Sequence, residues 1–153
     1  MLAARLGNIA ARPRRIQTFV TRLHARIMRL SRGRLRRSLL LAGGQPVLVL
    51  TTLGRKTGRA RSTPVAYARD GNRFVISGAN AGLDRPPAWS LNLEADPHAE
   101  IEVTGRRIAV RTRRLEGEER NPLYALLVAQ NAGAEVTAGL TSREVPVILL
   151  EPR

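Results

Sequence analysis

The sequence predicts a mainly β domain of the α+β class, an antiparallel barrel with helices packed outside it. Three observations predict this fold. From residue 47 onward, about six short β-rich segments follow one another, mostly joined by tight turns. Before Gly43-Gly44, apolar residues recur at helical spacing instead. Apolar residues make up 43% of the 153 residues and aromatic residues only 3%, so leucine, valine, isoleucine and alanine must form the core.

The first predicted element is a basic amphipathic helix within the N-terminal segment 1–44. Six apolar residues recur on one helical face: Ile16, Phe19, Val20, Leu23, Ile27 and Leu30. Residues 1–40 hold eleven arginines and no acidic residue, whereas the other 113 residues hold 15 basic and 12 acidic ones, so this segment carries most of the net charge of +14. Such a helix packs on the body, lies on an anionic membrane surface through residues 15–30, or contacts nucleic acid.

The barrel itself is assigned to residues 45–153. Strands are predicted at 47–52, 62–68, 73–77, 98–103, 106–115 and 145–150, and helices at 88–94 and 118–130. Asp70-Gly71-Asn72 and Thr104-Gly105 are predicted to be the tight turns of two hairpins. A loop rich in small residues and proline spans 78–87.

The composition excludes several kinds of site. The chain has no cysteine, which excludes disulfides, thiolate zinc sites and a cysteine nucleophile, and is typical of the reducing cytoplasm. The two histidines, His24 and His98, are far apart in sequence, and no metal site is predicted. No apolar stretch approaches the roughly 20 residues of a membrane span. No carboxylate pair or Ser–His–Asp grouping is evident, so no catalytic residue is predicted.

Residues 53–64, LGRKTGRARSTP, hold a cluster of cations that includes the only lysine of the chain. A phosphate-binding P-loop needs the lysine directly after the second glycine and a helix next, but here Lys56 lies between Gly54 and Gly58 and a β-rich segment follows. A hairpin connection between two strands is therefore predicted, with four cations projecting from it: Arg55, Lys56, Arg59 and Arg61. The hairpin is either a solvated charged turn or, with the nearby hydroxyls of Thr57, Ser62 and Thr63, an anion-binding site.

The segment PPAWSLNL, residues 86–93, is the second feature that could belong to a site. Trp89 and Asn92 are three residues apart and share one face of the predicted helix. A single tryptophan usually packs in the core, but a neighbouring buried amide could instead bind a planar ligand. The loop Ser77-Gly78-Ala79-Asn80 before it consists of small residues, which allow a flat ring to approach the backbone closely.

Taken together, these motifs resemble the deazaflavin-dependent nitroreductase family. The resemblance spans roughly residues 45–153 and is carried by VLVLTTLGRKTGRARSTPVAY, PPAWSLNLEADPHAEIEV, LEGEER and REVPVILLEP. The family implies a split β-barrel of the flavin-reductase-like kind and coenzyme F-420, an 8-hydroxy-5-deazaflavin, as the cofactor; FMN is less favoured. Its members come from mycobacteria and their relatives, and in them an amphipathic N-terminal helix can associate with the membrane.

The resemblance also implies roles for individual residues. Arg55, Lys56, Thr57 and Arg61 would hold the phosphate and acidic tail of the coenzyme. The deazaflavin ring would be lined by Thr63, Pro64 and Val65 and contacted by the loop Ser77, Gly78, Ala79 and Asn80, with Trp89 and Asn92 closing the pocket. Two departures are visible: Ser90 stands where many members have an aromatic residue, and residues 130–140 lack the tyrosines that often line the substrate pocket.

The predicted function is that of an F-420-dependent oxidoreductase. The reduced coenzyme would deliver a hydride to an acceptor. The protein would bind and orient the reactants and would exclude water from the site. A quinone or a nitro-aromatic compound is the predicted acceptor, and the cytoplasm or the inner face of the plasma membrane the predicted location. The alternatives are a carrier that binds a deazaflavin or flavin without turnover, and a nucleic-acid-binding protein acting through its N-terminus, for which few stacking aromatics are available.

Overall fold

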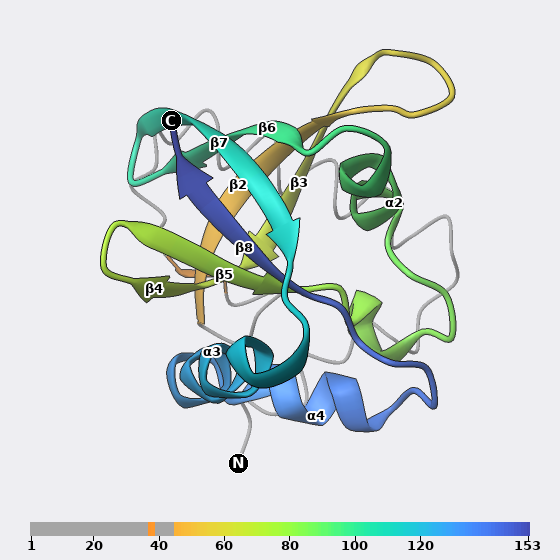
Figure 1. The fold of residues 1–153 in the computed structure, drawn as a ribbon, viewed down its shortest axis with the longest axis vertical. Coiled ribbons are helices and arrows are strands. Elements are labelled where there is room, and N and C mark those ends of the chain that lie inside the picture. The colour runs from red at the N-terminus through yellow and green to blue at the C-terminus, as the bar shows by residue number, and fades with distance from the viewer. Residues whose placement is uncertain (1–36, 39–44) are drawn as a thin grey trace.

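The structure, a computed structural model, describes residues 37–38 and 45–153. The predicted N-terminal helix lies outside these residues. Eight strands form one antiparallel sheet in the order β1-β2-β6-β7-β8-β5-β4, and β3 pairs with β2 away from this path. The sheet curls into a barrel, with α2 at one side and α3 and α4 together at one end (Figure 1). At the opposite end, the turn between β2 and β3 extends beyond the other elements (Figure 1).

The strands are β1 (Arg37–Ser38), β2 (Gln45–Leu53), β3 (Ala60–Ala66), β4 (Ala68–Asp70), β5 (Arg73–Ser77), β6 (His98–Val103), β7 (Arg106–Arg114) and β8 (Val147–Pro152). The helices are α2 (Ala88–Ala95), α3 (Gly117–Gln130), α4 (Gly133–Gly139) and the short 3-10 helix η3 (Asn80–Gly82). The predicted antiparallel barrel is thus confirmed, and each of its six predicted strands has a counterpart in the structure. The additional strands, β1 and β4, have only two and three residues.

The predicted second strand, 62–68, is wrong in its extent. The chain pairs with β2 up to Ala66 and with β5 from Ala68, so it changes partner at Tyr67. The carbonyl of Tyr67 accepts a hydrogen bond of 2.6 Å from the buried amide of Asn131, and its N–H donates to Pro46 O at 3.3 Å. Contacts far away in the sequence therefore divide a segment that reads locally as one strand.

Aliphatic side chains fill the barrel, as the composition predicts. The inward-facing residues of β2 and β8, among them Leu48, Leu50, Ile148 and Leu150, belong to one buried cluster that also contains Trp89. The alternate residues of β8, Val147 and Leu149, join Leu127 of α3 in a second cluster on the outer face. Because β8 is covered on both faces, its sequence is a continuous apolar run rather than an alternating one.

The end of α2 leads directly into β6 through Asp96-Pro97. The carboxylate of Asp96 accepts hydrogen bonds of 3.0 Å from the N–H and the ring Nδ1 of His98. These bonds hold the pKa of Asp96 below its usual value. His98 lies at the surface, where the sequence predicts it.

Candidate functional site

The β2–β3 hairpin is the element that carries the predicted anion-binding cations. Leu53 pairs with Ala60, and the six residues between them close through a hydrogen bond of 2.8 Å from Gly54 N–H to Arg59 O. Gly58 donates to Gly54 O at 2.7 Å and has a φ of 64°, a left-handed conformation that glycine adopts at low cost. The hairpin predicted from the sequence is therefore confirmed.

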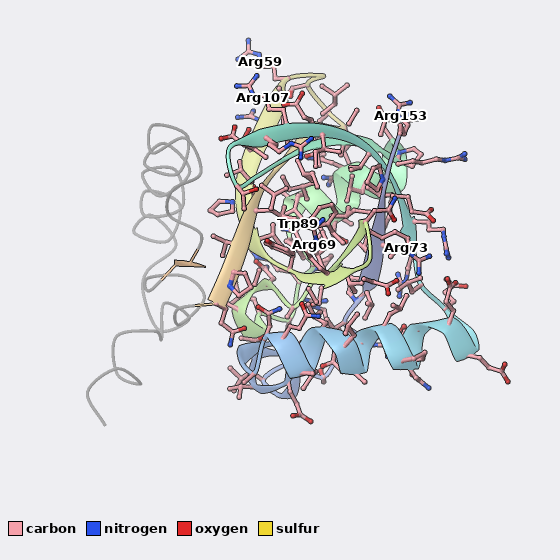
Figure 2. All side chains as sticks on the ribbon, turned by 90° about the vertical axis from the view of Figure 1, so that its left-hand side faces the viewer. Arg59, Arg69, Arg73, Trp89, Arg107 and Arg153 are labelled. Atoms are coloured by element: carbon pink, nitrogen blue, oxygen red, sulfur yellow. The ribbon has the colours of Figure 1, made fainter. Side chains whose placement is uncertain are left out.

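The four cations of this hairpin are exposed: Arg55, Lys56, Arg59 and Arg61. Within residues 45–153, none of them lies within 4.0 Å of a carboxylate, whereas Arg113 on β7 lies 2.6 Å from Glu119 and 3.5 Å from Glu151. Four like charges that repel one another at a turn, without acidic partners in the described part of the chain, create a strongly positive surface. Figure 2 shows Arg59 at the outer limit of the molecule.

Asn92 connects α2 to this hairpin. Its side-chain oxygen accepts a hydrogen bond of 3.1 Å from Arg55 N–H, and its nitrogen donates at 3.0 Å to Thr52 Oγ1. Asn92 is 5% exposed and Thr52 2%, so both polar groups depend on this contact for their hydrogen bonds. The structure thus brings Asn92 to the first cationic residue, and its amide fixes the direction in which the hairpin projects.

The three β3 residues predicted to line the ring do not share one face. Side chains along a strand alternate, so Thr63 and Val65 point to one side and Pro64 to the other. Val65 belongs to the barrel core, and Pro64 lies opposite Val49 of β2. Only one of the two sets can present its side chains to a given ligand, and the other can contribute main-chain atoms at most.

Trp89 lies in the barrel core. It is 8% exposed and belongs to the same buried cluster as Leu50 and Phe74, and Figure 2 shows it among the side chains that fill the barrel. Of the two roles that the sequence allows for this tryptophan, core packing and ligand binding, this position corresponds to core packing. Its neighbour Ser90 is also buried.

The loop between β5 and α2 has an unusual backbone. Three successive residues, Asn80, Ala81 and Gly82, have positive φ angles of 50°, 53° and 80°. For the two that are not glycine this conformation is strained, and strain of this kind persists only where surrounding contacts enforce it. The Asn80 side chain supplies one such contact, because it donates to Arg85 O at 2.9 Å.

Comparison with known proteins identifies the family. The family model described as F420H(2)-dependent quinone reductase matches residues 20–152. The chain belongs to this family. An F420H(2)-dependent quinone reductase of Mycobacterium tuberculosis is 35% identical over 145 residues, which cover 92% of this chain and 95% of that protein.

Solved structures agree with the match. An F420-H2 dependent reductase (FDR-A) superposes with a TM-score of 0.64 and 26% identity, over 69% of this chain and 94% of that one. A FAD-binding protein of Mesorhizobium loti, with a TM-score of 0.52 and 14% identity over 70% and 78% of the two chains, shares the fold alone.

Membership in the F420H(2)-dependent quinone reductase family confirms the main predictions. The fold is the predicted split β-barrel, the chain is an F-420-dependent reductase, and coenzyme F-420 is its cofactor. The match begins at residue 20, so it also covers part of the basic segment for which the sequence motifs show no resemblance. The predicted membrane contact rests on residues 15–30, outside the described part, and stays a prediction. No helix within the described residues is long and apolar enough to span a membrane.

Arg143 is a residue near the site that the sequence patterns do not indicate. Its guanidinium donates to Gly78 O at 2.6 Å and to Leu83 O at 3.1 Å, so it holds the β5–α2 loop from the segment before β8. The available signal was its place at the start of the motif REVPVILLEP, just before the predicted strand 145–150. An arginine that lies outside every predicted helix and strand is easily taken for an exposed surface residue.

Gly82→Ala is expected to destabilise the protein by roughly 2–4 kcal/mol, because the left-handed backbone and a close contact both oppose a Cβ there. The new Cβ would overlap the Cβ of Leu140 and lie 3.2 Å from Thr137 O. Gly71→Ala is the matched control: its φ is 62° and nothing lies within 4 Å of the position of its Cβ, so only the backbone cost of about 1 kcal/mol remains. Urea unfolding measures both; equal losses would contradict the close contact with Leu140.

Proposed function

We propose that this protein binds reduced coenzyme F-420 through the β2–β3 hairpin and reduces a quinone. The observation that supports this proposal best is the set of four exposed hairpin cations, Arg55, Lys56, Arg59 and Arg61, without a carboxylate partner among residues 45–153. A folded protein tolerates such a charge cluster at low cost when an anionic ligand neutralises it.

The chemistry of the hairpin fits the anionic part of the coenzyme. Arg55, Lys56 and Arg61 provide guanidinium and ammonium donors for phosphate and carboxylate oxygens, and Thr57 adds a hydroxyl. Arg59 extends the same positive surface at the tip. Because these side chains are exposed and carry no ion pair within the described part of the chain, binding an anion breaks none there. In this proposal the hairpin supplies affinity and fixes the position of the tail.

The ring is proposed to lie between β3 and the β5–α2 loop. Thr63 and Pro64 on β3 are only half-buried; in this proposal one of them presents its side chain to the ring and the other its main-chain atoms, while Val65 lies in the core on the same side of the strand as Thr63. Ser77, Gly78, Ala79 and Asn80 present main-chain groups and small side chains from the loop. Trp89 and Asn92 would complete this pocket from α2, Asn92 by holding the hairpin in place and Trp89 by anchoring the helix in the core.

The protein's part in the reaction is to bind and orient the coenzyme and the acceptor and to exclude water from the site. When bound, the reduced coenzyme supplies the hydride that reduces the acceptor. Residues of this chain hold the ring and leave one of its faces to the acceptor. The segment that contains α4 has no aromatic residue, and its Val136 and Leu140 are 67% and 58% exposed. These side chains give the acceptor side an apolar surface, which fits a quinone.

The decisive test is titration of the purified protein with oxidised F-420 and, separately, with FMN, followed by fluorescence. We expect saturable binding of F-420 in the micromolar range and weaker binding of FMN, which has one phosphate and no acidic tail. Rapid oxidation of the bound reduced coenzyme by menadione would then separate a reductase from a carrier. The absence of F-420 binding would refute the proposal.

A further inference from the structure

The β5–α2 loop is held in its conformation from the segment that precedes β8. Arg143 in this segment donates three hydrogen bonds to main-chain carbonyls: from Nη2 to Gly78 O at 2.6 Å, from Nε to Leu83 O at 3.1 Å and from Nη1 to Glu144 O at 3.5 Å. The first two carbonyls stand on either side of the left-handed residues 80–82. One planar guanidinium therefore joins the two ends of the strained turn.

Other contacts between the same two segments depend on this arrangement. Gly78 N–H donates to Pro146 O at 2.8 Å, and a Cβ on Gly78 would lie only 2.7 Å from Pro146 Cγ. The hydroxyl of Thr141 donates to Asp84 at 3.0 Å. The loop and the segment 140–146 thus contact each other at several points, at Gly78 and again at residues 82–84.

The charge of Arg143 is directed at these carbonyls. Its side chain is half-buried, and among the described residues no carboxylate lies within 4.0 Å of it. Hydrogen bonds from a charged donor are stronger than those from a neutral one. They can therefore offset the backbone strain of Asn80 and Ala81, which would be uncompensated without them. Lysine has a single ammonium group and cannot reproduce the two-carbonyl geometry.

We propose that Arg143 is a positioning residue for the coenzyme: it keeps the loop 78–83 in the shape that receives the ring. This inference rests on the proposed function. Arg143 acts through Gly78 and Leu83, and because the same segment carries Leu140 beside Gly82, the loop is held jointly with the proposed acceptor side.

The test compares Arg143→Gln and Arg143→Lys with wild type and with Arg120→Lys. Arg120 is a matched control, because it donates to Val145 O at 3.1 Å in the same segment but does not contact the loop. Amide hydrogen exchange is measured first on the coenzyme-free protein. In Arg143→Gln, exchange of the amides at 78–83 is expected to rise roughly tenfold while that of the hairpin 54–59 stays unchanged. In Arg143→Lys, the exchange rate of these amides should lie between those of Arg143→Gln and wild type.

Titration with oxidised F-420 completes the test. The Kd is expected to rise roughly tenfold in Arg143→Gln, less in Arg143→Lys, and not in Arg120→Lys. Wild-type binding together with an unchanged Kd in Arg143→Gln would overturn this inference and leave the proposed function standing. An equal rise in Arg120→Lys would also overturn it, since general destabilisation would then explain the effect. Failure of the wild-type protein to bind F-420 would overturn the proposed function and this inference together.

Discussion

The double variant Lys56→Ala/Arg61→Ala is expected to bind coenzyme F-420 roughly 10- to 30-fold more weakly than wild type, because it removes two charged donors from the proposed clamp. Each exposed ion pair contributes at most about 1 kcal/mol, so a single substitution would raise the Kd by no more than about fivefold. Together the two act on the same polyanion, and their effects add. Fluorescence titration of the purified variant measures the change.

The fold should survive this substitution. Both side chains are exposed and lack ion pairs within residues 45–153, so the midpoint of urea unfolding should stay close to that of wild type. Arg106→Ala, which removes one exposed arginine at the start of β7, shows the effect of losing a surface charge away from the hairpin and should leave the Kd nearly unchanged. Added salt should weaken wild-type binding more than binding by the double variant. Equal salt dependence would show that these cations do not contact the coenzyme.

Asn92→Leu is expected to reduce both stability and coenzyme affinity. The substitution leaves the buried Thr52 hydroxyl and the Arg55 N–H without their partner, which costs about 1–3 kcal/mol in the free energy of unfolding. It also releases the hairpin from α2, so the cations lose their fixed direction and the Kd for F-420 should rise. Urea unfolding and fluorescence titration measure the two effects separately.

Thr52→Val makes it possible to distinguish the two roles of Asn92. In the double variant Thr52→Val/Asn92→Leu both buried polar partners are replaced by apolar groups, so the stability should return to within about 1 kcal/mol of wild type. The Arg55 N–H still lacks its acceptor, so the affinity should stay low. If the affinity recovered with the stability, Asn92 would have no role in directing the hairpin.

The features that could be predicted from the sequence are those that depend on neighbouring residues. The glycines of LGRKTGRARSTP, the β-branched residues on both sides and the absence of a helical pattern specify a hairpin, and the structure contains one at residues 53–60. The strands at 73–77 and 98–103 match the prediction to the residue. Their boundaries coincide with turn residues, which act locally.

The features that could not be predicted depend on contacts between distant segments. The division of the second predicted strand at Tyr67 follows from pairing with β5 and from the amide of Asn131, 64 residues away. Arg143 reaches Gly78 over 65 residues. The short helix α4 has two glycines among its seven residues, so its own propensity does not predict it. Packing of this segment on Gly82 compensates for that low propensity.

The position of β8 has a consequence for when the protein can first take up its coenzyme. Among the described strands β8 is synthesised last, yet in the sheet this strand lies between β7 and β5. A nascent chain can form the β2–β3 hairpin early, because its contacts are local, but it can neither close the barrel nor brace the 78–83 loop before residues 140–152 leave the ribosome. In the proposed site, stable binding of the ring therefore has to follow the synthesis of β8.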